Sequence, residues 1–174
     1  MNVFADRLRS IDAFGARAAG ALEDVFLLAM RVYVSWQFLK SGWLKLQDWD
    51  TTRFLFEEEY HVPVLSPALA AVLGTLGELV FPALLIAGLL GRLAALGLFG
   101  VNALAVIAYA HVLYADGYEG ALAQHHLWGV MLLTLVVIGP GRWSADHWLT
   151  GGDGIVRRRS KAGADASRRI ADGG

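Results

Sequence analysis

Four apolar runs follow one another between residues 25 and 138, and each is about as long as a membrane-spanning helix. The second run, residues 66–90, contains a single charged residue, Glu78, close to its middle. About 20 apolar residues in a helix match the roughly 30 Å hydrocarbon core of a bilayer. The pattern therefore predicts an all-α integral membrane protein, an antiparallel four-helix bundle over residues 25–149. Its expected spans are 25–46, 66–90, 93–113 and 121–138.

The segments outside these runs have patterns of their own. Residues 1–24 place apolar side chains at helical spacing between charged ones, which predicts an amphipathic helix on the membrane surface. A frayed polar terminus is the alternative. Between the first two runs we expect a short helix that Asp50 caps and Pro63 ends, either as an interfacial lid or as a solvated face. Residues 150–174 are rich in Gly, Ala, Ser and Arg and predict a disordered basic tail.

Composition and charge indicate a membrane environment and the orientation of the chain in that membrane. Of the 174 residues, 56% are apolar and 18% charged, a balance that excludes an ordinary soluble domain. Basic residues gather in both terminal segments and at Arg92, whereas the opposite loops offer only Arg53 and the boundary residue Lys45. Because basic segments remain in the cytoplasm, we expect both termini there and the lipid bilayer around the spans. Apart from the basic tail, nothing indicates nucleic-acid binding.

Ionisable side chains within the apolar runs are the candidate functional residues, since a charge inside a bilayer is costly unless it is paired. Small residues surround Glu78 at helical spacing, so its side chain should face the protein interior. Arg31 and Lys40 are both candidates for its partner, and the sequence leaves the choice open. An ion pair that only fixes helix register is one interpretation. The other is a polar pocket in the outer half of the bundle, built by Lys45, Glu78, His111, Gln124, His125 and His126.

Glu78, His111 and Lys45 could supply the hydrogen-bond donors and the titratable group that a quinone would need beside an apolar slot. His111 with His125 or His126 lacks a close ligand spacing, so we expect neither a metal nor haem. No catalytic residue stands out, and the absence of cysteine excludes a thiol intermediate on this chain. The candidate cofactor-binding residues are Arg31, Lys40, Lys45, Glu78, His111, His125 and His126.

Four stretches resemble the DoxX family of small four-span bacterial membrane proteins, over about residues 25–149. The family's Arg, Gly and Lys pattern resembles RVYVSWQFLKSGWLKL, and its Glu-to-Arg stretch resembles GELVFPALLIAGLLGRLAAL. The end of its third span is similar to VIAYAH, and its closing motif is similar to GPGRWSADHWL. Lys40 and the adjacent His125 and His126 have no place in that pattern. The matching positions are Arg31, Gly42, Lys45, Glu78, Gly88, Arg92, His111, Arg142, Ser144 and Asp146.

The resemblance implies a protein of the bacterial inner (plasma) membrane and two kinds of function. The family is named for a relative of a thiosulfate:quinone oxidoreductase subunit, and other members associate with redox-stress proteins. This implies a quinone-linked accessory or subunit with protein partners in a membrane redox or stress-response system. Some DoxX-like proteins accompany gene clusters for metal-stress peptides. The alternative is therefore a non-enzymatic scaffold, for example in metal-stress or peptide-export systems, with a structural ion pair. Whether the chain itself catalyses a reaction is left open.

Overall fold

The computed structural model describes residues 3–150, and within that range every regular element is a helix. The prediction of an all-α protein is confirmed, whereas the expected tail lies outside the described residues, apart from Thr150. The elements are α1 (Val3–Gln47), α2 (Trp49–Glu58), α3 (Pro67–Ala87), α4 (Gly91–Ala108), α5 (Ala110–Leu113), α6 (Glu119–Ile138) and α7 (Ala145–Leu149).

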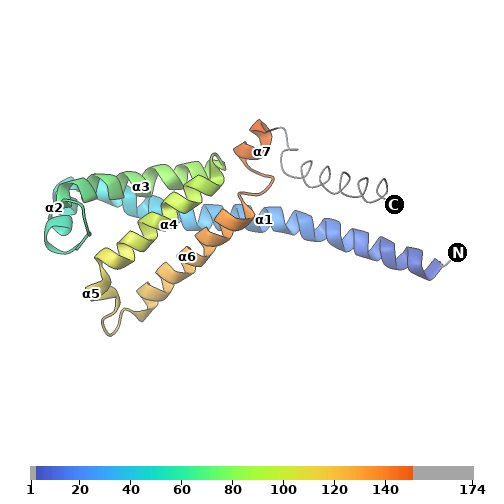
Figure 1. Ribbon diagram of the computed structural model, residues 1–174, viewed down its shortest axis with the longest axis horizontal. Coiled ribbons are helices and arrows are strands. Elements are labelled where there is room, and N and C mark those ends of the chain that lie inside the picture. Colours follow the sequence, from blue (N-terminus) through green and yellow to red (C-terminus); the bar gives the residue numbers. More distant parts are fainter. Residues whose placement is uncertain (1–2, 151–174) are drawn as a thin grey trace, which may run out of the picture.

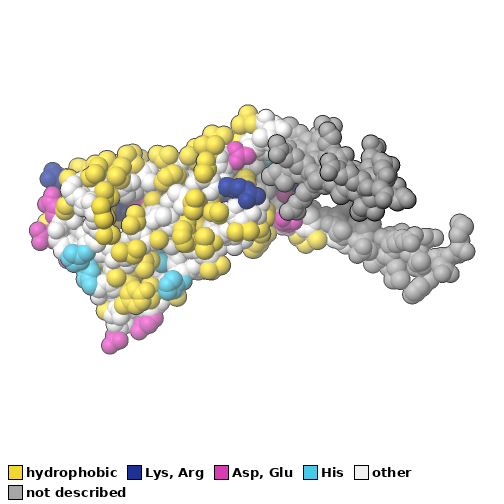
Figure 2. Space-filling view, viewed as in Figure 1, with side chains coloured by type: hydrophobic (Ala, Val, Ile, Leu, Met, Phe, Trp, Pro, Cys, Tyr) yellow, Lys and Arg dark blue, Asp and Glu magenta, His cyan; other side chains and the backbone are white. Residues whose placement is uncertain are grey.

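Three of the described helices, α3, α4 and α6, are long and apolar enough to cross a membrane. They correspond to the expected second, third and fourth spans. Apolar side chains cover most of the face shown in Figure 2, and charged side chains gather near its two ends. α1 does not reach the same apolarity, because Arg31, Lys40 and Lys45 interrupt its second half. The structure therefore supports three spans, and the count of four stays a prediction.

α1 is one continuous helix of 45 residues. Its N-terminal part projects beyond the other helices, and its C-terminal part lies along α3 (Figure 1). No backbone break separates the expected surface helix, residues 1–24, from the expected first span. Good helix formers such as Ala21, Leu22 and Glu23 occupy the junction, which explains the continuity. Most side chains of residues 1–24 are not among those that the structure describes, so the amphipathic pattern stays a prediction.

The third expected span, residues 93–113, is divided in the structure. α4 ends at Ala108, and Tyr109 has backbone angles of φ −111° and ψ 21°, outside the helical range. The one-turn helix α5 follows and carries His111. The backbone N–H of His61 donates to the Ala108 carbonyl at 2.9 Å, so the α2–α3 connection satisfies the end of α4. His111 therefore does not continue the helical face of α4, contrary to the expectation.

The predicted short helix between the first two runs is confirmed as α2, but its cap is Asp48, not Asp50. The Asp48 carboxylate accepts from the Thr51 backbone N–H at 3.0 Å and from the Thr51 hydroxyl at 2.7 Å. These hydrogen bonds, the hydroxyl first, lower the pKa of the Asp48 carboxyl, because they stabilise its ionised form. The helix consequently begins directly after α1 and covers one end of α3 (Figure 1).

Charged side chains close the other end of the bundle, where α3 finishes and α4 begins. The Asp146 carboxylate accepts from the backbone N–H groups of Leu90 and Gly91 at 2.8 and 2.7 Å, which caps α4. Arg92 donates to the carbonyls of residues 136–138 at 2.8–3.0 Å, which caps α6. Both caps tie the segment after α6 to the α3–α4 turn.

Candidate functional site

Lys45 of α1 and Glu78 of α3 form an ion pair inside the helix bundle. The Lys45 Nζ donates to Glu78 Oε1 at 2.6 Å, to Glu78 Oε2 at 2.5 Å and to the Ser41 hydroxyl at 3.0 Å. These contacts use all three hydrogens of the ammonium group. The two charged side chains retain only 17% and 10% of their exposure. Glu78 is thus paired within the protein, and its partner is neither Arg31 nor Lys40.

The close approach of α1 and α3 decides which cation reaches Glu78. A Cβ atom on Gly42 would lie 2.9 Å from Leu79 Cγ and 3.0 Å from Glu78 Cβ, so only glycine allows this helix spacing. Lys45 lies one turn after Gly42 on the same face of α1 and meets Glu78 at once. Arg31 is 14 residues earlier, about 21 Å along the helix axis, and is too distant.

Arg31 has a different role, at the end of the bundle where α4 begins. Its side chain is 1% exposed. The guanidinium donates to the Ile86 carbonyl at 2.9 Å, to the Trp143 carbonyl at 3.0 Å and also to the Pro140 carbonyl. It therefore joins α1 to the end of α3 and to the loop after α6, and it takes no part in the pocket expected around Glu78.

Lys40 lies on an outer face of α1, away from Glu78. It is exposed in a groove that also contains Trp36, Trp43 and Leu79. Among the described residues it forms no ion pair. Because both oxygens of the Glu78 carboxylate accept from Lys45, the prediction that Lys40 competes for Glu78 is wrong.

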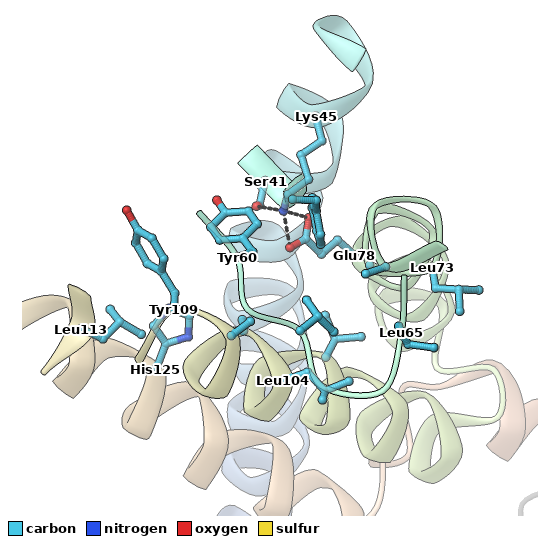
Figure 3. A pocket seen from close by; sticks show the side chains of 17 residues that line it. Ser41, Lys45, Tyr60, Leu65, Leu73, Glu78, Leu104, Tyr109, Leu113 and His125 are labelled. Carbon is cyan, nitrogen blue, oxygen red and sulfur yellow. Dashed lines mark hydrogen bonds and ion pairs between the residues drawn. The ribbon is translucent and has the colours of Figure 1, made fainter. Parts of the chain in front are cut away.

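A cavity of about 340 Å³ lies beside the Lys45–Glu78 pair. Figure 3 shows the pair on one wall and His125 of α6 on another, away from the pair. Most of the remaining wall is apolar and comes from α2, the α2–α3 connection, α3, α4 and α5, including Phe56, Leu73 and Leu104. Ligand pockets typically have volumes of about 300–1,000 Å³ and apolar walls with a few polar groups, so this cavity can hold a small organic ring.

Tyr60 supplies a hydroxyl group to the same cavity. Its ring packs edge-to-face on Phe56 and Tyr109, with centroids 4.9 and 5.2 Å apart. In Figure 3 it lies beside Ser41 and the ion pair. Burial raises the pKa of the Tyr60 hydroxyl, and Tyr109 and the Glu78 carboxylate raise it further. Tyr60 therefore keeps its proton at neutral pH and can donate a hydrogen bond to a ligand.

His125 lines the cavity and is held by Asn102 of α4. The Asn102 Nδ2 donates to the His125 backbone carbonyl at 3.0 Å, and Asn102 Oδ1 lies 2.9 Å from the ring Nδ1. The Asn102 residue is buried, and the His125 ring packs edge-to-face on Trp128, with centroids 5.0 Å apart. Both neighbours restrict the rotation of the imidazole.

The other polar residues expected in the pocket lie outside it. His111 is exposed and packs against His61 and Tyr109, with ring centroids 4.9 and 5.4 Å apart. Gln124 donates to the Tyr33 hydroxyl at 3.3 Å, and His126 is exposed. Adjacent residues on a helix point about 100° apart, which explains why the cavity takes His125 and not its neighbour.

Residues 26–111 match the DoxX family model. The chain carries a DoxX domain. The comparison with curated proteins and the comparison with solved structures each returned no match. Together with the three apolar helices, the DoxX domain identifies a membrane protein.

The DoxX domain contains most of the cavity. Lys45, Glu78, Tyr60 and Tyr109 all lie within residues 26–111, whereas His125 lies beyond the matched range. The closing motif after α6, which also resembles the family, lies beyond it as well, so that part of the resemblance stays a prediction. The match supports the resemblance to the DoxX family over residues 26–111 and assigns no ligand to the cavity.

The two polar residues that lie beside the ion pair in Figure 3, Ser41 and Tyr60, escaped the sequence analysis. Ser41 precedes Lys45 by one helical turn, a spacing that predicts contact between their side chains, so this signal was available. Tyr60 follows α2 in an irregular segment, where helical periodicity carries no information on direction. Tertiary contacts show where that segment lies, namely the hydrogen bond from His61 to α4 and the packing of Tyr60 on Tyr109.

Proposed function

We propose that this DoxX protein binds a quinone or quinol in the cavity beside Lys45 and Glu78, as a quinone-linked subunit or accessory of a membrane redox system. The supporting observation is an apolar cavity of about 340 Å³ with a buried ion pair in its wall. A quinone ring is flat and apolar with two polar oxygens, which matches apolar walls and a small number of convergent polar groups.

Each polar group of the cavity has a role in this proposal. The Tyr60 hydroxyl donates to one ligand oxygen. The Glu78 carboxylate, held beside the cavity by Lys45, can accept a proton that the ligand gives up. Because intramembrane ionisable groups are costly, their presence beside a cavity favours a functional site over a merely structural pair.

The proposal includes a topology with four antiparallel spans and both termini in the cytoplasm of a bacterial cell. α1 supplies the first span, because Gly42 packs it along α3 and Glu78 neutralises Lys45. Arg92, Arg142 and the basic C-terminal segment then lie on the cytoplasmic side, and α2 lies outside. The cavity consequently opens in the outer half of the membrane.

Reporter fusions test this orientation. An alkaline phosphatase inserted near Glu58 should be active, whereas the same enzyme fused after Arg159 should be inactive, because phosphatase folds only outside the cytoplasm. A green fluorescent protein at each position should give the opposite pattern. Activity of the phosphatase after Arg159 would contradict the assigned orientation and the outer position of the cavity.

Quinone retention tests the function itself. Protein purified in mild detergent from a quinone-producing bacterium should retain about one quinone per chain after gel filtration, measured by solvent extraction and chromatography. An unrelated multi-span protein prepared in the same way provides the background. Retention no higher than that background, with no saturable binding of an added short-chain quinone, would refute the proposal and favour a scaffold that anchors partners.

A further inference from the structure

We infer that the cavity prefers the reduced, hydroxyl form of its ligand, because Asn102 holds His125 with an unprotonated nitrogen available to the cavity. This inference rests on the proposed function and adds to it the redox form that is bound. Asn102 is a positioning residue in this scheme, and His125 is the residue that contacts the ligand.

The orientation of the Asn102 amide follows from its backbone contact. Its terminal group lies 3.0 Å from the His125 carbonyl oxygen, which can only accept a hydrogen bond. The amide NH₂ must therefore face that carbonyl. The amide oxygen then faces the imidazole Nδ1 at 2.9 Å.

The tautomer of His125 follows in turn. An amide oxygen can only accept, so the Nδ1 atom opposite it carries the hydrogen. In a neutral imidazole the other nitrogen, Nε2, then has a lone pair and accepts. We take His125 as neutral, because no carboxylate within the described residues pairs with it and the Glu78 carboxylate, on another wall of the cavity, is paired with Lys45.

The accepting nitrogen belongs to the part of the ring that is left for the cavity. Asn102 occupies the Nδ1 side and does not line the cavity, whereas His125 does. A quinone oxygen placed against Nε2 would bring two acceptors together, and neither could donate. A quinol hydroxyl donates there, and its second oxygen accepts from Tyr60, which remains protonated. His125 and Tyr60 thus offer one acceptor and one donor, which is the complement of a quinol.

Binding of both redox forms tests this inference. We expect the purified protein to bind a short-chain quinol about tenfold more tightly than the corresponding quinone, measured by calorimetry without oxygen, because one hydrogen bond is replaced by an acceptor–acceptor contact. His125→Phe should remove the preference. The matched variant His126→Phe, on the exposed neighbour, should retain it.

Asn102→Asp should change the preference between quinol and quinone in the opposite direction. A carboxylate beside Nδ1 stabilises the imidazolium, whose Nε2 carries a hydrogen and donates, so the preference should shift toward the quinone. This result does not depend on the folding of the His125 variant. A merely structural role for Asn102 would weaken both ligands equally.

The tautomer is also measurable without any ligand. ¹⁵N NMR of wild-type protein labelled at histidine should show His125 neutral, with its hydrogen on Nδ1. A hydrogen on Nε2, or equal affinity for quinol and quinone, would overturn this inference while leaving quinone binding intact. Failure of both forms to bind would overturn the proposed function together with it.

Discussion

Replacing Glu78 with Gln will lower the free energy of unfolding by about 3 kcal/mol, because it leaves the Lys45 ammonium buried without a counter-charge. The amide keeps the size of the carboxylate, so the loss reports the charge and not a cavity. Reversible unfolding in mixed detergent micelles, followed by circular dichroism, measures it. Combining Glu78→Gln with Lys45→Met should recover much of the loss, since neither charge then remains unpaired.

The matched control uses the other lysine of the same helix. Lys40→Met on the exposed face of α1 should change stability by no more than about 0.5 kcal/mol and should not rescue Glu78→Gln. The coupling energy of each double-mutant cycle identifies the partner. A Glu78→Gln protein as stable as wild type would contradict the pair and would mean that Glu78 is protonated in the native protein.

Replacing Arg31 with Leu should destabilise the protein by at least about 3 kcal/mol. The change removes the donor from three carbonyl groups, those of Ile86, Pro140 and Trp143, and each buried unpaired group costs about 1–3 kcal/mol. Arg31→Lys should recover only part of the loss, because an ammonium lacks the planar fork of the guanidinium. The same unfolding measurement applies.

Arg142 provides the control for this prediction. It lies in the loop that Arg31 holds, but its side chain is 73% exposed and pairs with Asp24 at 3.3 Å. The Asp24 carboxylate is buried, but it also accepts from the Arg142 backbone N–H at 3.0 Å, and the substitution leaves that contact in place. Arg142→Gln should therefore have a small effect. Equal effects of the two substitutions would show that Arg31 is not the residue that holds this end of the bundle.

The sequence predicted the parts of the fold that depend on one helix at a time. The apolar runs predicted α3, α4 and α6, and the Asp50 and Pro63 signals predicted α2, although Asp48 is its cap. The division of the third run at Tyr109 was not predictable, because its residues are as apolar as those of an uninterrupted helix. What distinguishes Tyr109 is the contact between the α2–α3 connection and the end of α4, which is tertiary.

The sequence predicted only part of the candidate site, because the site also depends on contacts between helices. Glu78, Lys45 and His125 were recognised as candidate pocket residues, and the structure brings all three to one cavity. The choice of Lys45 as partner depends on the rotation and spacing of α1 against α3, which the Gly42–Leu79 contact decides. The two interpretations of Glu78, ion pair and pocket, are also compatible, since the pair forms part of the cavity wall.

Filling the cavity tests the central claim most directly. Ala105 lines it from α4, whereas Ala123 is exposed on α6 and lines no part of it, so the same Ala→Phe substitution can be made at both positions. Affinity for a short-chain quinol, measured by calorimetry, should fall at least about tenfold in Ala105→Phe and remain unchanged in Ala123→Phe. Unchanged affinity in a folded Ala105→Phe protein would show that any quinol bound by this protein lies elsewhere.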